Sequence, residues 1–254
     1  MIFAVVPNDL GFLTNVTTYS INVHPDPAIP ADPAVDAFDP HVSGDIVSYT
    51  AGAKIRYYDF STGDDKQVPS PPGAQDLLSD VSGGKIVFSR VQTNGSVEIL
   101  VYDTLADTTT VADPSVAPQL RFGSAIGGNT VAVIDWVLRP EGELVVADLA
   151  GGATRLTTDS LVDRLPNVSP SGDRIVWESC TSTTCDIHEA VRVGTSWTTH
   201  AITNNSEHEG NPDTDGAVIV YDATRSGERH IYWQPVGVAL SSGWSCRVGS
   251  GIPR

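Results

Sequence analysis

Acidic side chains recur along this sequence at places from which they could act together. Asp135, Glu178 and Asp222 each end a run of apolar residues, and they lie 43 and 44 residues apart. Carboxylates that converge repel each other unless they face water or share a cation. Ca²⁺ suits such a set because it accepts about six to eight oxygen ligands in flexible geometry. We therefore hypothesise a calcium site made by these three residues, with solvent-facing strand ends as the simpler alternative.

Four further residues could carry out chemistry beside such an ion. Asp163 and Glu209 stand where the next extended runs begin, and either could add a ligand or act as a base. Arg90 or His208 could stabilise developing negative charge. Together with the ion, this group would suit hydrolysis of an ester, a lactone or a phosphotriester.

Three other kinds of site are not indicated. The sequence has no Gly-x-Ser-x-Gly motif and no phosphate-binding glycine loop. Its six histidines lack the His-Glu-x-x-His spacing of a zinc peptidase. His188, His208 and His230 could transfer protons near the ion, and the alternative for each is a solvent-facing or core-bonded histidine, which is the commoner case.

Two of the three cysteines are close in sequence. Cys180 and Cys185 flank four polar residues that we expect to form one hairpin loop. We expect a disulfide between them, and this implies a secreted or periplasmic bacterial protein. The alternative is a pair of unpaired thiols. Cys246 is expected to be a free thiol in a disordered tail.

Composition limits the partners. The 254 residues carry 31 acidic and 15 basic side chains, a formal net charge of −16, and basic residues do not cluster. A nucleic-acid ligand is therefore not expected, because its phosphates would be repelled. The sequence has no stretch of 18 apolar residues, so we expect no membrane span. We also expect a monomer.

The strongest signal is a repeat. Five segments read as strand, glycine turn and apolar strand, and their glycines are 39 to 45 residues apart (Gly44, Gly83, Gly127, Gly172 and Gly216). A further strand in each repeat ends in an aspartate before a polar turn, as at Asp59, Asp103 and Asp148, and we expect this aspartate to bind turn amides. Periods in this range are typical of β-propeller blades. We predict an all-β fold of five four-stranded blades.

Two motifs resemble those of the TolB-like (WD40-like) propeller family. Residues 166–172 read Pro-Asn-Val-Ser-Pro-Ser-Gly, similar to the family's Pro-x-x-Ser-Pro-Asp-Gly turn. Residues 58–63 read Tyr-Asp-Phe-Ser-Thr-Gly, similar to its Tyr-Asp-x-x-Thr-Gly turn. The resemblance covers Asp36 to Trp233. It implies a propeller that commonly has six blades, and often a non-catalytic interaction module.

The ends of the chain determine how the ring would close. The last repeat lacks a clear fourth strand, while residues 13–21 alternate like a strand. We predict that this N-terminal strand closes the ring. The expected organisation is residues 1–35 as closing strand and proline-rich connector, 36–240 as propeller and 241–254 as disordered tail.

Aligning the repeats on their glycines puts the candidate residues at one mouth of the central channel. The second strands then end at Thr50, Arg90, Asp135, Glu178 and Asp222, and the first strands begin at Asp36 or Ala37, Asp76, Leu120, Asp163 and Glu209. Two functions remain open. One is a calcium-dependent hydrolase of a small-molecule substrate, and the other is a non-catalytic module that binds a protein or glycan at the channel mouth.

Overall fold

The computed structural model describes residues 4–5, 16–17, 29, 35–112, 121–136, 142–236 and 246–247. Every regular element within these residues is a β-strand, so the all-β prediction is confirmed. The chain divides into two units, Met1–Ala31 and Asp32–Arg254. In the first, β1 (Ala4–Val5) pairs antiparallel with β2 (Val16–Thr17). Among the described residues, no helix has the length and apolar character needed to cross a membrane.

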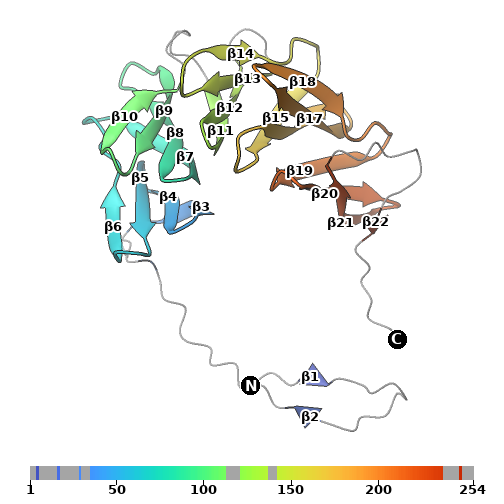
Figure 1. Cartoon of the computed structure of the whole chain (residues 1–254), viewed down its shortest axis with the longest axis horizontal. Coiled ribbons are helices and arrows are strands. Elements are labelled where there is room, and N and C mark those ends of the chain that lie inside the picture. The colour runs from blue at the N-terminus through green and yellow to red at the C-terminus, as the bar shows by residue number, and fades with distance from the viewer. Residues whose placement is uncertain are drawn as a thin grey trace. The chain divides into compact units, whose positions relative to one another are not determined.

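The second unit contains five antiparallel sheets of four strands, which we call blades 1 to 5 (Figure 1). Blade 1 consists of β3 (Ala37–Ser43), β4 (Ile46–Ala51), β5 (Lys54–Asp59) and β6 (Asp64–Gln67). Blade 2 consists of β7 (Gln75–Ser82), β8 (Lys85–Val91), β9 (Val97–Asp103) and β10 (Thr108–Val111). Blade 3 consists of β11 (Arg121–Gly127), β12 (Thr130–Asp135), β13 (Glu143–Asp148) and β14 (Ala153–Arg155). Blade 4 consists of β15 (Val162–Val168), β16 (Arg174–Cys180), β17 (Cys185–Val193) and β18 (Ser196–Ala201). Blade 5 consists of β19 (His208–Thr214), β20 (Val218–Arg225), β21 (Glu228–Pro235) and β22 (Cys246–Arg247).

Each blade is a meander whose strands pair in sequence order. The first strands β3, β7, β11, β15 and β19 lie at the inner edges of the blades in Figure 1. The aspartates before the polar turns bind turn amides as expected. Asp59 accepts from Ser61 N, and Asp148 accepts from Ala150 N. The bond from Ala150 N lowers the pKa of Asp148 and fixes the turn.

Consecutive blades pack face to face. We call the face toward the preceding blade the leading face and the face toward the next blade the trailing face. In blade 4, the leading face includes Ile175 and Trp177, which pack with Ile134 and Leu144 of blade 3. The trailing face includes Val176 and Ile187, which pack with blade 5. Because side chains alternate along a strand, one apolar run serves both interfaces, and this explains why the second strands carry apolar residues on both faces.

The C-terminal region differs from the expectation. Blade 5 does have a fourth strand, because Cys246 and Arg247 of β22 pair with Trp233 and Tyr232 of β21. This edge of β21 is the place that we gave to the N-terminal strand, so the prediction that the last repeat lacks a fourth strand is wrong. The signal was missed because two residues are too few to show a strand period. Closure of the ring and the exact blade number stay predictions.

Candidate functional site

The predicted site residues lie near the start of each first strand and the end of each second strand. Strand pairing fixes their equivalence, because the first strand of every blade shifts register at the same place. The last pair before the shift joins the first strand to one second-strand residue in each blade: Thr50, Ser89, Ile134, Glu178 and Asp222.

Asp135 and Arg90 are therefore not equivalent to Glu178 and Asp222, and this part of the sequence alignment is wrong. Each lies one residue further along its strand, and a shift of one residue moves a side chain to the other face of the sheet. The alignment failed in blade 3 because the turn glycine with positive φ is Gly128 rather than Gly127. Leu120 lies outside the described residues.

On the leading faces, Arg90 and Asp135 each form an ion pair. Arg90 donates to both oxygens of Asp76, Nε to Oδ1 at 2.6 Å and Nη2 to Oδ2 at 2.9 Å, and Nη2 also donates to the carbonyl of Pro69. Arg155 Nη2 donates to Asp135 Oδ2 at 3.0 Å. Both carboxylates are buried, so the arginines compensate their charge within the fold.

Glu178 and Asp222, on trailing faces, meet the same neighbour, Asn211. The backbone N–H of Asn211 donates to Glu178 Oε1 at 2.8 Å, and its side-chain amide donates to Asp222 Oδ2 at 2.7 Å. Each also binds an arginine, Arg164 at Glu178 and Arg229 at Asp222. Burial acts to raise the pKa of Asp222, but the bonds from Arg229 and Asn211 outweigh it and hold this pKa below its usual value. Asn211 thus joins two of the predicted ligands across the interface of blades 4 and 5.

Asp163 and Glu209 are fully buried at equivalent positions, where they bind the connection from the preceding blade. Asp163 accepts from Trp177 Nε1 at 3.0 Å, and burial raises its pKa to about 6 although the hydroxyls of Thr157 and Ser179 and the Trp177 indole oppose this. Glu209 accepts from Asn205 Nδ2 at 2.8 Å and Thr203 Oγ1 at 3.3 Å, and burial raises its pKa as well.

The threonines in these bonds continue into the neighbouring sheet. Thr157 Oγ1 accepts from Leu144 N at 2.7 Å, and Thr203 Oγ1 accepts from Ile187 N at 2.8 Å. Each carboxylate thereby ties the first strand of its own blade to the third strand of the preceding blade. This geometry supports a structural role for Asp163 and Glu209.

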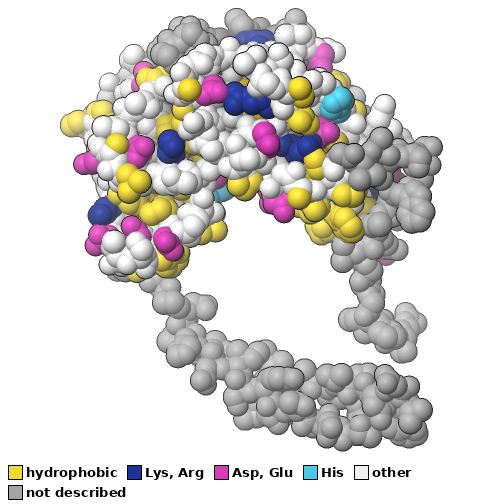
Figure 2. Space-filling model, viewed as in Figure 1, with side chains coloured by type: hydrophobic (Ala, Val, Ile, Leu, Met, Phe, Trp, Pro, Cys, Tyr) yellow, Lys and Arg dark blue, Asp and Glu magenta, His cyan; other side chains and the backbone are white. Residues whose placement is uncertain are grey.

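His208 is exposed at the start of β19. It also lowers the pKa of Asp222, but less than the bonds from Arg229 and Asn211 do. Over the visible face of the blades, acidic and basic side chains are interspersed (Figure 2). The predicted residues thus lie at neighbouring places in successive blades, and Glu178 and Asp222 share Asn211 as a partner.

The structure does not gather the five acids into one cluster of ligands. Among the described residues, one group of three histidine, cysteine or acidic side chains has donor atoms all within 4.8 Å of one another, and it consists of Glu178, Cys180 and Cys185. Asp135, Asp163, Asp222 and Glu209 are not in it. An oxygen cage for Ca²⁺ is therefore not preformed around Asp135, Glu178 and Asp222.

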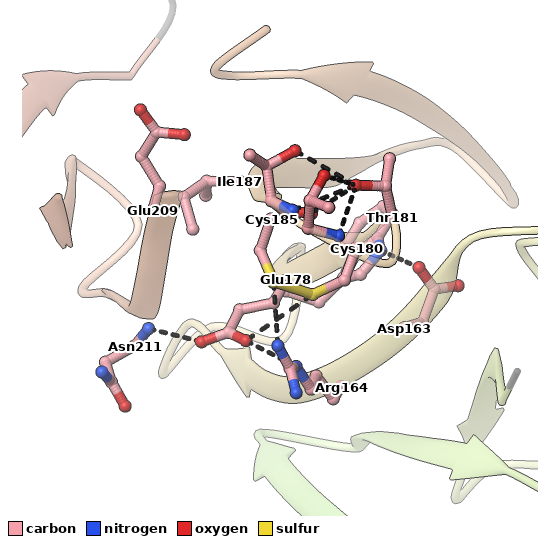
Figure 3. The surroundings of a disulfide bond; sticks show 12 residues. Asp163, Arg164, Glu178, Cys180, Thr181, Cys185, Ile187, Glu209 and Asn211 are labelled. Atoms are coloured by element: carbon pink, nitrogen blue, oxygen red, sulfur yellow. Dashed lines mark hydrogen bonds and ion pairs between the residues drawn. A yellow bond between two sulfur atoms is a disulfide. The ribbon is translucent and has the colours of Figure 1, made fainter. Parts of the chain in front are cut away.

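The Cys180–Cys185 disulfide is present as predicted. Figure 3 shows Arg164 beside this disulfide and beside Glu178, with Asn211 on the other side of the Glu178 carboxylate. In the same view, the carboxylates of Asp163 and Glu209 do not converge on Glu178.

A feature that sequence reasoning missed is a repeated bulge in the innermost strands. The residue at the bulge has positive φ in all five blades: Asp39, Leu78, Gly123, Leu165 and Asn211. Glycine, asparagine and aspartate adopt this backbone readily, whereas leucine does so at a cost. In blades 4 and 5 the sequence signal is an acid three residues before proline, at Asp163–Pro166 and Glu209–Pro212.

A pocket of about 290 Å³ lies between blades 3 and 4. Trp177 and His188 line it with their rings 5.6 Å apart, and Thr157–Asp159 and Thr199–Ala201 complete its wall together with Leu156. Burial lowers the pKa of His188, which favours its neutral form. The volume is at the lower end of the range for small-ligand sites.

Comparison with known proteins identifies the architecture. No protein-family model matches the sequence, and no curated protein matches it. Among solved structures, a protein assigned as TolB from Agrobacterium tumefaciens superposes with a TM-score of 0.61 at 14% identity, covering 80% of this chain and 78% of that one. An oligogalacturonate lyase in complex with manganese has a TM-score of 0.61 at 14% identity, over 84% of this chain and 65% of that one. A prolyl endopeptidase has a TM-score of 0.60 at 11% identity, and here the match covers 83% of this chain but 36% of the peptidase. At the level of the fold, the chain is similar to TolB and related β-propeller proteins.

Proposed function

We propose that this protein is a non-catalytic, extracytoplasmic binding module that takes a protein ligand on its innermost strands. The observation that carries the proposal is the pair of leucines in the repeated bulge. Leu78 and Leu165 have φ values of 54° and 48°, and their exposed fractions are 37% and 51%. Exposed leucine in left-handed backbone gains nothing in stability, so a contact with a ligand is a reason for its presence.

The neighbouring blades support this interpretation. At the same position they have residues that fit the left-handed backbone, Asp39, Gly123 and Asn211. Phe38, next to Asp39, is also exposed. These apolar side chains come from blades 1, 2 and 4, and a protein surface with apolar side chains could contact them together, whereas a glycan would prefer polar partners beside its rings. The disulfide supports an extracytoplasmic location.

The test is a double variant, Leu78→Asn and Leu165→Asn. Asparagine tolerates positive φ, so the fold should be retained while the apolar contacts are lost. Leu105→Asn is the control, because Leu105 is 93% exposed in an outer turn. A partner captured from the source cells and then purified should bind the wild type and the control, and bind the double variant at least about 10-fold more weakly. Equal binding by all three proteins would remove the bulge leucines from the ligand site.

A calcium-dependent hydrolase is the second candidate. The observation that favours it is the approach of two predicted ligands at Gly210: a Cβ there would lie 2.9 Å from Glu178 Oε1 and 3.7 Å from Asp222 Oδ1. The raised pKa of Asp163 also suits a general acid. Chelator should then lower the melting temperature and abolish turnover of an activated ester or phosphotriester, and calcium should restore both. Unchanged melting in chelator and no turnover would exclude the calcium-dependent hydrolase and leave the binding module as the proposed function.

A further inference from the structure

The hairpin of β16 and β17 places three side chains that bind metals at one point. Cys180 and Cys185 are directly opposed, and Glu178 lies two residues before Cys180 on the same face of the sheet. Their ligand atoms lie within 4.8 Å of one another. In the structure the two sulfurs are joined in a disulfide, so neither is available as a thiolate ligand.

We propose that reduction of the Cys180–Cys185 disulfide creates a Zn²⁺ site made of Cys180, Cys185 and Glu178. Two thiolates and a carboxylate are ligands that zinc accepts, and thiolates favour it over calcium and magnesium. Three protein ligands leave a fourth position for water. The disulfide is then a redox gate for metal binding at the end of the fourth blade's second strand.

The hairpin does not depend on the disulfide for its register. Ser179 pairs with Asp186 next to the cysteines, and the loop is closed by bonds of its own. Thr181 N donates to Thr184 O at 2.8 Å, and Thr181 Oγ1 accepts from the backbone N–H groups of Thr183 and Thr184. These bonds remain after reduction, so the two thiols stay opposed.

Glu178 is already oriented toward the sulfurs. The backbone N–H of Asn211 holds Oε1, which leaves Oε2 on the side of Cys180 Sγ, 3.9 Å away. A hydrogen bond to the outer oxygen of a ligating carboxylate is the usual way in which a protein fixes such a ligand. Asn211 belongs to blade 5, so the bond that orients the metal ligand Glu178 crosses the interface of blades 4 and 5.

Arg164 occupies the position of the ion in the oxidised protein. Its Nη2 lies 2.8 Å from Cys185 Sγ, and its Nε donates to Glu178 Oε2 at 2.9 Å. The side chain is 45% exposed and can turn into solvent when a divalent cation takes its place. Zn²⁺ offsets the charges of the two thiolates, so the site with Glu178 carries a single net negative charge once Arg164 has turned away.

The chemistry balances with a dithiol as reductant. The dithiol supplies two electrons and two protons, the bond between Cys180 Sγ and Cys185 Sγ breaks, two thiols form, and the reductant becomes a disulfide. Binding of Zn²⁺ then releases both thiol protons to solvent.

The experiment uses the full chain with Cys246→Ser, so that only the two hairpin thiols remain. Reduced and oxidised protein are titrated with Cd²⁺, which reports thiolate coordination by an ultraviolet charge-transfer band, and Zn²⁺ affinity is measured by competition with a chromophoric chelator. We expect the reduced protein to bind one ion with this band and the oxidised protein to show none. Glu178→Gln should keep the band but weaken Zn²⁺ binding at least about 10-fold, whereas Glu228→Gln, at an exposed acid of blade 5, should not change it.

Circular dichroism of the reduced protein accompanies the titration. A folded reduced protein that binds metal with equal affinity in the Glu178 and Glu228 variants would overturn the proposal, because Glu178 would not be a ligand. Metal binding of the same strength in the oxidised protein would overturn it as well. So would loss of the fold on reduction, since the site could not then be preformed.

Discussion

Ile187 and Ile231 occupy the same position on the trailing faces of blades 4 and 5, and their environments are opposite. Each is the strand partner of an acid in the second strand, Glu178 or Asp222. Ile187 is 0% exposed, because blade 5 covers it, and Ile231 is 58% exposed. The same side chain in the same local structure is thus a core residue in one blade and a surface residue in the next.

This difference predicts unequal effects of one substitution. Ile187→Ala should lower the free energy of unfolding by about 2 to 5 kcal/mol, because it leaves a cavity between two blades. Ile231→Ala should change it by about 0.5 kcal/mol or less, as at other surface positions. Chemical denaturation of both variants measures this. Similar losses at the two positions would mean that another segment covers blade 5 in solution.

Ring closure by the N-terminal strand is tested by deletion. If these residues cover the part of the β21 edge beyond Tyr232 and Trp233, which β22 occupies, removing residues 1–20 should lower the melting temperature by several degrees and promote aggregation, because an open strand edge pairs with other chains. Light scattering during a thermal scan measures both effects. A deletion protein that melts like the full chain and stays soluble would show that these residues do not close the ring.

His41 should make stability depend on pH in the alkaline range. Its side chain binds Asp39 and, in blade 2, Asp80, and these bonds raise its pKa from 6.5 to about 10. A raised histidine pKa adds stability that is complete below pH 6.5 and is lost as the pH rises toward 10. The effect should be small, because the side chain is partly exposed to solvent. Unfolding at several pH values should show a downward slope in this window that His41→Gln reduces. An identical slope in the His41→Gln variant would show that the contact of His41 with Asp80 of blade 2 does not cause the pH dependence.

Asp163 should also make stability fall with rising pH, in this case in the acidic range. Burial raises its pKa from 3.8 to about 6, so the folded protein holds a proton that the unfolded chain has released. Stability therefore falls as the pH rises from about 4 to 6. Asp163→Asn keeps an oxygen that can accept from Trp177 Nε1 and has no charge to bury. Urea unfolding between these pH values should be flatter in the variant than in the wild type. Parallel curves would show that Asp163 titrates normally.

Much of the fold is readable from the sequence, while the partners of the site residues are not. Turn glycines such as Gly44 and Gly172 recur because each hairpin needs positive φ, so their spacing revealed the blades. The face on which Asp135 lies depends on whether Gly127 or Gly128 forms the turn before its strand, and two adjacent glycines in a sequence do not show which of them has the positive φ. The ion pair of Asp135 with Arg155 joins residues 20 apart, and contacts of this kind follow only from the register of the strands.

The same limit applies to Glu178. Its proximity to the two cysteines can be predicted once the hairpin is assigned, because residues two apart in a strand share a face of the sheet. Its bond to Asn211 crosses from one blade to the next, 33 residues later, and depends on the left-handed backbone at Asn211. Local patterns predict the hairpin, and only packing between the sheets brings the acid to its partners.

The order in which the blades pack has a consequence for how the propeller opens. The main packing contacts between sheets join neighbours in the chain, as in the layers around Trp177 and Ile187. Such an array is quasi-one-dimensional, and its stability is approximately a sum of units and nearest-neighbour interfaces. Amide hydrogens should therefore exchange fastest in blades 1 and 5, which each pack mainly against one other sheet in the part of the chain that the structure describes, and slowest in blade 3. Fraying would then proceed from both ends toward the middle, one interface at a time.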